Sequence, residues 1–239
     1  MKGTIEAIIL SGGKGKRLRS VTMDQIPKGL VKIKERPILE WQLVWLRKHG
    51  VKRIIFALGH LAHKIQEYFG EEFDTPWGNV ELAYSIEKEK LGSGGAVKLA
   101  QRLVTANDVF IINGDVLTTM NLNDLINFHE EKNAEATMGL VKMRSPFGVI
   151  KVENGVITEF VEKPILPVWI HSGIDLFSSE LLSKFPEKGQ MEDTIFVELA
   201  QQKRFMGYEA PDDVYWLSID TQKEYETANK EFPSTELLP

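Results

Sequence analysis

Segments with strand character alternate with segments of helix character along the first half of this chain. Apolar runs at 7–10, 53–59, 80–86 and 109–113 have the length and β-branched content of buried strands. Amphipathic stretches at 38–49, 62–69, 94–103 and 122–132 follow them in turn. Strands that are joined through helices pair in parallel and bury both faces under helices. The pattern therefore predicts an α/β fold with a mixed, mainly parallel central sheet.

The rhythm changes after residue 135, where strand-like segments at 137–143, 149–152 and 156–161 follow one another. Asn154-Gly155 between the last two is a strong hairpin turn. We expect a small β-rich insert at about 137–164, a return to the main sheet at 170–177, and a last strand at 214–219. With 239 residues, the chain suits one domain, a Rossmann-like three-layer α/β/α unit over 1–232, with a loose tail at 233–239.

Composition excludes several classes of function. The formal net charge of −5 argues against a broad nucleic-acid surface. The absence of cysteine excludes disulfides, thiolate metal sites and cysteine nucleophiles. No apolar run approaches the roughly 18 residues of a membrane span, and no basic-then-apolar leader begins the chain. We therefore expect a cytoplasmic protein with no nucleic-acid or membrane partner.

The first strand leads into a glycine-rich, basic loop. Three glycines, Gly12, Gly13 and Gly15, follow it, with Lys14, Lys16, Arg17 and Arg19 among and after them. Glycine lets backbone N–H groups turn toward an anion, and the cations supply the opposite charge. The spacing fits neither a P-loop nor the dinucleotide fingerprint, which requires glycine where Leu18 stands. The loop is interpreted as a phosphate cradle of another kind.

The segment Gly12-Gly13-Lys14-Gly15-Lys16-Arg17-Leu18, followed by Pro27-Lys28, resembles the signature of the sugar-1-phosphate nucleotidylyltransferases. Lys16 departs from it, because threonine is usual there. The resemblance implies that Arg17, Lys28 and a later lysine, Lys163 of Glu162-Lys163-Pro164, act on the reacting phosphates. It also implies a nucleotide-binding set of Leu10, Ser11, Gly12, Gly13, Gly15, Glu87 and Gly92.

Glu87 precedes Leu91-Gly92-Ser93-Gly94-Gly95, which is similar to the segment that reads the base in this family. A carboxylate accepts hydrogen bonds and donates none, so it suits the adjacent N1–H and N2–H₂ donors of guanine and suits uracil or thymine poorly. This favours GTP. The alternative is a surface charge among Lys88, Glu89 and Lys90.

The sugar side is also implied by resemblance. Phe147-Gly148-Val149, Glu162 and His171-Ser172-Gly173 match segments that face the sugar in relatives, which assigns Gly148, Glu162, His171 and Gly173 to sugar binding. His171 replaces the usual asparagine. It can either bond a sugar hydroxyl or be a packed histidine.

Two aspartates are candidates for a Mg²⁺ site. Asp115 follows the strand 109–113, where ligands gather in an open α/β sheet, and matches the metal aspartate of the family. At the second metal position Ser218 replaces the usual aspartate, and Asp220 stands two residues on, on the same face of a strand. Asp220 either reaches the same ion or is a turn residue before Thr221.

The resemblance spans nearly the whole chain and is closest to guanylyltransferases acting on mannose or manno-heptose 1-phosphate. We expect an enzyme that uses Mg²⁺ to join a nucleoside triphosphate to a sugar 1-phosphate, with release of pyrophosphate. Cytidylyl, thymidylyl or uridylyl transfer to glucose 1-phosphate is the alternative, and a non-catalytic sugar-nucleotide sensor is a second. The tryptophan-bearing helix at 38–49 suits a core as well as an interface, so homo-oligomerisation stays open.

Overall fold

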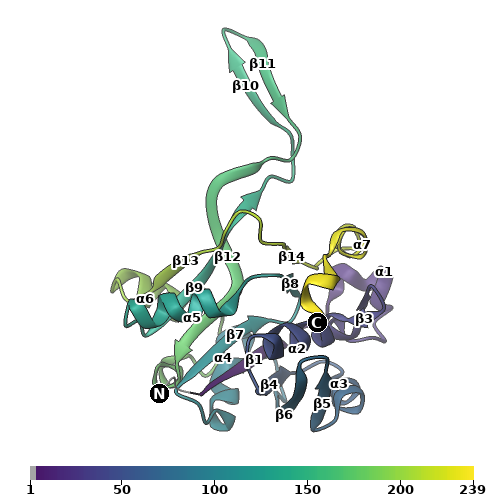
Figure 1. Cartoon of the computed structure of the whole chain (residues 1–239), viewed down its shortest axis with the longest axis vertical. Helices are drawn as coiled ribbons and strands as arrows, with labels where there is room; N and C mark the ends of the chain where they lie inside the picture. Colours follow the sequence, from purple (N-terminus) through teal and green to yellow (C-terminus); the bar gives the residue numbers. More distant parts are fainter. Residues whose placement is uncertain (1–3) are drawn as a thin grey trace.

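The computed structural model describes residues 4–239, so the first three residues of the expected domain lie outside the description (Figure 1). Its centre is an eight-stranded sheet. From edge to edge the strands are β13 (Met206–Glu209), β9 (Ala136–Arg144), β12 (Ile165–Ser178), β7 (Asp108–Asn113), β1 (Ile5–Ser11), β4 (Arg53–Leu58), β6 (Gly78–Ile86) and β5 (Glu72–Thr75).

The middle of the sheet is parallel. β1 lies between β7 and β4, with Ile8 beside Ile111 on one side and Ile55 on the other, and β4 pairs in parallel with β6. β12 runs antiparallel to both of its neighbours, and β5 is an antiparallel edge strand that the sequence pattern did not predict. The mixed, mainly parallel sheet expected from the sequence is confirmed.

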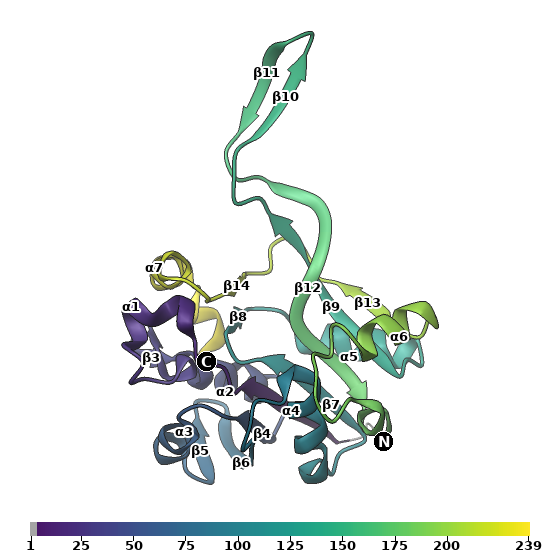
Figure 2. The same ribbon diagram turned by 180° about the vertical axis from the view of Figure 1, so that it is seen from behind.

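Alternation along β1 divides the core into two layers. Ala7 and Ile9 pack into one hydrophobic cluster and Ile8 into the other, because neighbouring side chains of a strand point to opposite faces. The helices covering the first face are α2 (Ile38–Lys48), α3 (Ala62–Phe69), α5 (Leu122–Glu131) and α7 (Gln222–Glu231). The second face is covered by α4 (Gly92–Ala100), the 3₁₀ helix η4 (Ser179–Lys184) and α6 (Ile195–Gln201). This is the expected three-layer arrangement, seen from opposite sides in Figures 1 and 2.

Helix α2 is a core element. Trp41 and Trp45 are both 2% exposed, and their indole N–H groups donate to the carbonyls of Ile33 and Met120, each at 2.8 Å. The helix ends at His49 because Gly50 adopts a left-handed φ of 90°. The two tryptophans therefore serve the core of this chain.

Smaller elements complete the chain. They are the 3₁₀ helices η1 (Lys16–Leu18), η2 (Lys28–Leu30) and η3 (Gln101–Leu103), the helix α1 (Arg19–Thr22), and two strand pairs, β2 (Lys32–Ile33) with β3 (Arg36–Pro37) and β8 (Val116–Thr118) with β14 (Trp216–Ser218). The last strand is thus shorter than the expected 214–219. Among the helices within residues 4–239, none has both the length and the apolar character needed to cross a membrane.

The β-rich insert is smaller than expected. β9 and β12 belong to the main sheet, so only the segment between them, with β10 (Val149–Glu153) and β11 (Val156–Val161), leaves it. Asn154 and Gly155 form the predicted turn, both with positive φ, and the hairpin extends away from the body of the molecule (Figures 1 and 2). We call β10, the turn and β11 the arm.

The expectation of a loose tail at 233–239 is wrong. Residues Ser234–Leu237 form the 3₁₀ helix η5, and Leu237 is 2% exposed. The carbonyl of Leu237 accepts a hydrogen bond from the Trp77 indole at 2.7 Å. Burial of a leucine side chain contributes about 1.5–3 kcal/mol, which favours docking of this segment on the core.

Candidate functional site

A cleft lies at the carboxyl ends of the parallel strands. Its larger part, about 870 Å³, is lined by Asn113 at the end of β7, Gly59 after β4 and Glu87 after β6. The smaller part contains Arg17, Lys28, Asp115 and Asp220. Leu10, Gly13, Gly15 and Lys16 line both parts, so the glycine loop after β1 joins them. Open α/β sheets bind ligands at this edge.

The glycine loop presents backbone and cations to this cleft. Residues between the end of β1 at Ser11 and the start of η1 at Lys16 form neither helix nor strand. Gly15 has φ of 58°, a left-handed conformation that glycine adopts without strain, and a side chain at Gly13 would meet no atom within 4 Å. Leu18 is fully buried beneath the loop. The Arg17 side chain, 72% exposed, stands at the rim and is ion-paired with Asp220.

Lys28 lies between the two predicted metal ligands. Its Nζ is 2.6 Å from Asp115 Oδ2 and 2.7 Å from Asp220 Oδ1, and Arg17 Nη2 is 2.9 Å from the same Asp220 oxygen. The structure thus brings Arg17, Lys28, Asp115 and Asp220 together from four separate segments. It places Asp220 beside Asp115, on the same Lys28 ammonium, and a shared metal ion stays a prediction.

Buried hydrogen bonds fix the backbone at Asp115. The Gln42 side chain, 2% exposed on α2, donates from Nε2 to the carbonyls of Asn113 and Val116, each at 2.8 Å. The carbonyl of Asp115 accepts from the N–H of Ile219 at 2.9 Å. These contacts hold the turn between β7 and β8, and they tie it to the segment that carries Asp220.

The start of α7 holds Asp220. Glu224 Oε2 accepts from the backbone N–H of Asp220 at 2.8 Å and of Thr221 at 2.7 Å, and Thr221 and Glu224 form a capping box. Ser218, at the usual aspartate position, ends β14 opposite Val116. Asp220 therefore lies two residues beyond the end of the strand, where its side chain contacts Lys28.

The donors fit a small hard cation. Two carboxylates converge on one positive charge, the Lys28 ammonium, and Mg²⁺ typically takes one or two protein carboxylates together with waters and substrate phosphates. Within residues 4–239 no group of three or more His, Cys, Asp or Glu side chains is placed to hold a metal. A cation on Asp115 and Asp220 would thus complete its coordination from outside the protein.

Glu87 lies on the floor of the larger part of the cleft. Its Oε2 accepts from the Leu91 N–H at 2.9 Å. Side chains at Gly12 and Gly59 would come within 3.1 Å and 2.6 Å of Oε1, so glycine at both positions makes room for the carboxylate. Gly92 lines the same space. Glu87 is therefore part of the cleft, and its carboxylate has further acceptor sites besides the one that Leu91 uses.

His171 is a packed, ion-paired histidine. Its Nε2 lies 2.8 Å from Oδ2 of Asp175, which is fully buried, and its ring packs edge-on against Phe196. Burial lowers the pKa of His171, but the charge and hydrogen bond of Asp175, with a contribution from Glu192, raise it above the ordinary value. Burial also raises the pKa of Asp175. Gly173, with φ of 75°, lies against the Asn113 side chain at the edge of the cleft.

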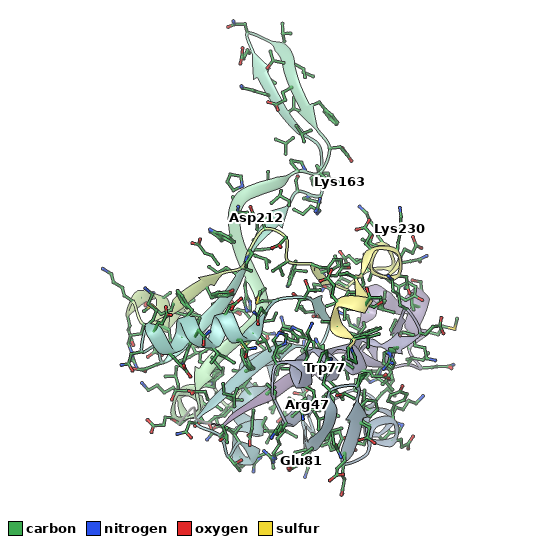
Figure 3. All side chains as sticks on the ribbon, viewed as in Figure 1. Arg47, Trp77, Glu81, Lys163, Asp212 and Lys230 are labelled. Carbon is green, nitrogen blue, oxygen red and sulfur yellow. The ribbon has the colours of Figure 1, made fainter. Side chains whose placement is uncertain are left out.

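None of the predicted sugar-side residues lines the cleft, His171 and Gly173 on β12 included. Gly148, Glu162 and Lys163 flank the arm, and none of them lines either part of the cleft. Lys163 Nζ is 2.9 Å from Glu162 Oε1, and Figure 3 shows Lys163 at the base of the arm, above the body. The structure therefore does not join Lys163 to Arg17 and Lys28, and its action on phosphate stays a prediction.

Three residues of the site escaped sequence reasoning. Gln42 gives no signal, because a glutamine on an amphipathic helix is ordinary. Gln190, whose Oε1 accepts from Ser93 at the cleft wall, lies in an irregular segment. Asp175 did carry a signal, since it interrupts the apolar strand of β12 four residues after His171, on the same face of that strand.

Comparison with known proteins covers almost the whole chain. Residues 6–235 match the family model described as nucleotidyl transferase. The D-glycero-alpha-D-manno-heptose 1-phosphate guanylyltransferase of Aneurinibacillus thermoaerophilus is 34% identical over 235 residues, which cover 95% of this chain and 98% of that protein. Mannose-1-phosphate guanyltransferase beta-A of Xenopus laevis is 33% identical over 232 residues, but the match covers only 63% of its length.

Solved structures agree with this. HddC from Yersinia pseudotuberculosis, complexed with GMP-PN, has a TM-score of 0.74 and 27% identity over 95% of this chain and 99% of that one. A putative glucose-1-phosphate thymidylyltransferase from Bacillus anthracis, 21% identical with a TM-score of 0.75, shares the fold. Sequence, fold and cleft thus agree: the chain belongs to the nucleotidyl transferase family, whose members generally depend on a metal ion.

Proposed function

We propose that this protein transfers a guanylyl group from GTP to a manno-heptose 1-phosphate, giving the GDP-sugar and pyrophosphate. The observation that carries the proposal is the cluster of Lys28, Asp115, Asp220 and Arg17 beside the glycine loop, at the phosphate end of a cleft large enough for a nucleotide. The guanylyltransferase from Aneurinibacillus thermoaerophilus, similar over nearly its full length, supports the choice of reaction.

The chemistry needs little from a general base. The phosphate of a sugar 1-phosphate has its second pKa near 6, so its oxygen is already anionic near neutral pH. That oxygen forms a bond to the α-phosphorus of GTP, while the bond from the α-phosphorus to the bridging oxygen breaks and pyrophosphate leaves with the electron pair. Catalysis then consists of alignment and charge neutralisation, as in other phosphoryl transfers.

The residues of the cleft supply both the alignment of the substrates and the neutralisation of their charge. The backbone of Gly12 to Gly15 holds the triphosphate, and Arg17 at the rim stabilises the charge that develops on the leaving pyrophosphate. Lys28 neutralises the reacting phosphates. Lys163 fixes the sugar phosphate, which requires the base of the arm to approach the cleft when both substrates are bound.

Asp115 and Asp220 would hold Mg²⁺, which supplies charge neutralisation shared between the phosphates of the two substrates. In the free protein the Lys28 ammonium occupies the position between these carboxylates. A cation held there would neutralise these carboxylates and would leave the Lys28 ammonium to contact phosphate oxygens. The exchange gives Lys28 two partners in succession.

Glu87 selects the base. The Glu87 carboxylate lines the cleft beside Gly12 and Gly59 and has acceptors for N1–H and N2–H₂ of guanine. GMP-PN, bound in the Yersinia pseudotuberculosis HddC structure, is a guanine nucleotide analogue, which supports this choice. His171 and Gly173 remain the sugar-side candidates on β12, next to Asn113.

A pyrophosphate-release assay tests the proposal. D-glycero-α-D-manno-heptose, α-D-mannose and α-D-glucose 1-phosphates are each combined with each nucleoside triphosphate in the presence of Mg²⁺. Turnover should be fastest with GTP and the heptose phosphate. Glucose 1-phosphate with CTP is the specific competitor, because Asp220-Thr221 is similar to the pair found in cytidylyltransferase branches of the family. Strong turnover with CTP or UTP and none with GTP would overturn the assignment.

A further inference from the structure

An irregular segment from the second half of the chain contributes to the wall of the larger part of the cleft. Residues 186–192, between η4 and α6, form neither helix nor strand, and they lie against the turn that begins α4. The carbonyl of Gly189 accepts from the N–H of Gly94 at 3.0 Å, and the Gly189 N–H donates to the carbonyl of Leu91 at 2.8 Å. The segment is therefore hydrogen-bonded to the residues that follow Glu87.

Glycines in α4 allow this close approach. A side chain at Gly92 would come within 2.5 Å of the carbonyl oxygen of Gly189. A side chain at Gly95 would come within 2.7 Å of the carbonyl oxygen of Glu187. Because backbone meets backbone at both places, the 186–192 segment is held directly on the start of α4.

Gln190 is the residue of this segment that lines the cleft. Its side-chain Oε1 accepts from the backbone N–H of Ser93 at 2.9 Å, and its main-chain carbonyl accepts from Thr194 Oγ1 at 2.7 Å. A backbone N–H can only donate, so the amide atom that faces Ser93 must be the oxygen. This contact fixes the orientation of the amide, and the Nε2 donors are the part of it that Ser93 does not engage.

Glu87 and Gln190 are attached to the same turn. Glu87 Oε2 accepts from the N–H of Leu91. Gln190 Oε1 accepts from the N–H of Ser93, two residues further along the chain. Two residues span at most about 7 Å, and both side chains line the same part of the cleft. Glu87 offers acceptors and Gln190 offers donors, so the pair suits the edge of a base that carries both kinds of group.

We propose that the Gln190 amide donates to O6 of guanine, next to the N1–H that Glu87 accepts. The inference rests on the proposed guanylyl transfer and assigns it a second residue that selects the base. Guanine carries an acceptor at position 6, whereas adenine carries an NH₂ donor there. Glu87 and Gln190 together match three neighbouring groups of guanine, namely O6, N1–H and N2–H₂.

Two lysines are the rival donors. Lys88 and Lys90 also line this part of the cleft, and both are exposed in a segment without helix or strand. Ordering a long side chain on binding costs conformational entropy. The Gln190 amide is already oriented by its contact with Ser93, which makes it the favoured donor.

Gln190→Glu is the variant that isolates the donor. It keeps an oxygen to accept from Ser93 and replaces the NH₂ group with an acceptor, with little change of shape. Glu192→Gln is its control, because Glu192 Oε2 also contacts Ser93 Oγ, at 2.7 Å, but does not line the cleft. A defect in the docking of the 186–192 segment would appear in both variants.

Three purine nucleotides separate the contacts. GTP and ITP carry O6, whereas 2-aminopurine riboside triphosphate has a hydrogen there and carries the same triphosphate. We measure kcat/KM for each with D-glycero-α-D-manno-heptose 1-phosphate, and the fluorescence of 2-aminopurine gives its binding constant independently of turnover. Gln190→Glu should lower kcat/KM for GTP and ITP at least about tenfold, but for the 2-aminopurine nucleotide less than about threefold. Glu192→Gln should retain the nucleotide preference of the wild type.

The outcomes separate this contact from the reaction itself. An equal loss for all three nucleotides, no loss for GTP, or the same pattern in Glu192→Gln would overturn the contact with O6. Loss of the O6 dependence in Lys88→Met or Lys90→Met, with Gln190→Glu unaffected, would assign O6 to a lysine and would also overturn it. A wild type that prefers CTP or UTP to GTP would instead remove the proposed function, and this inference with it.

Discussion

Asp115 and Asp220, far apart in the chain, both contact the same atom, Nζ of Lys28, at 2.6 and 2.7 Å. The three side chains are about a quarter exposed or less, so their charges interact with weaker solvent screening than surface pairs do. A divalent cation held by these carboxylates, as we propose, would compete with the Lys28 ammonium for them. Such competition would link metal binding to the freedom of Lys28.

Metal binding should depend on both aspartates. Asp115→Asn and Asp220→Asn each remove one anionic ligand, and each should lower the affinity of the nucleotide-free protein for Mn²⁺ at least tenfold, or about 1.4 kcal/mol. Electron paramagnetic resonance of free Mn²⁺ measures this directly. Ser218→Ala, at the usual position of the second aspartate, should bind Mn²⁺ as the wild type does. An effect of Ser218→Ala equal to that of Asp220→Asn would contradict the assignment.

Lys28→Met should raise the affinity for Mn²⁺ instead of lowering it. Without the ammonium the two carboxylates are free for the metal, so the affinity of the nucleotide-free protein should rise severalfold while guanylyl transfer is lost. Lys16→Met is the control. Lys16 lines the same part of the cleft, and its substitution removes the same formal charge without breaking an ion pair to the aspartates. A fall in Mn²⁺ affinity for Lys28→Met would show that Lys28 assists the metal site.

Gln42→Leu should disturb the metal site from a distance. It leaves the carbonyls of Asn113 and Val116 without their buried donor, which should lower the free energy of unfolding by about 1–3 kcal/mol and weaken Mn²⁺ binding. Asn121→Ala is a control for stability, since loss of the cap of α5 costs about 1 kcal/mol. Chemical denaturation and Mn²⁺ titration of both variants check this. Equal Mn²⁺ affinity in the two would refute a positioning role for Gln42.

The pair of His171 and Asp175 should make stability depend on pH. Both pKa values are raised in the folded chain, so folding takes up protons and stability falls as pH rises. The contribution of His171 is complete below its unfolded pKa of 6.5 and is lost as pH rises through the higher folded pKa. The stability lost in His171→Gln should therefore shrink as pH rises from about 6.5 through the higher folded pKa, relative to exposed His63→Gln. A difference that grows with pH would contradict this.

Glu87→Gln should lower the selectivity for GTP over other nucleoside triphosphates. The amide replaces one acceptor with a donor that opposes guanine's own donors, which should cost about 1–3 kcal/mol, or tenfold to hundredfold in kcat/KM for GTP. Glu89→Gln is the control, because Glu89 lines the same cleft but pairs with Lys188 at 2.9 Å. Steady-state kinetics with GTP and UTP measure the effect. An unchanged preference for GTP would remove Glu87 from base selection.

Local patterns predicted most elements of the fold. Helix α3 at Ala62–Phe69 and the arm around Asn154-Gly155 agree with the expected ranges, because periodicity and turn chemistry are local. The position of β12 between β9 and β7, antiparallel to both, depends on long-range packing that no local pattern encodes. The buried tail at Leu237 was missed for the same reason, since its partner Trp77 lies far away in sequence.

The candidate site, too, was predicted only where its position follows from local sequence patterns. The glycine loop and Asp115 follow strand ends, so topology alone brings them to one edge of the sheet. That Asp220 reaches Lys28 depends on where β14 ends and how the α7 cap turns the chain, which only the structure gives. The distance of Lys163 from the cleft depends on the direction of the arm, and no residue pattern fixes that direction.

A competition experiment tests guanylyl transfer most directly. Equimolar ATP, CTP, GTP and UTP are incubated with the protein, Mg²⁺ and D-glycero-α-D-manno-heptose 1-phosphate, and the nucleotide sugars formed are identified by mass spectrometry. The account predicts GDP-heptose as the main product, formed in equal amount with pyrophosphate, and no product from a variant carrying both Asp115→Asn and Asp220→Asn. Accumulation of CDP- or UDP-heptose without GDP-heptose would contradict it.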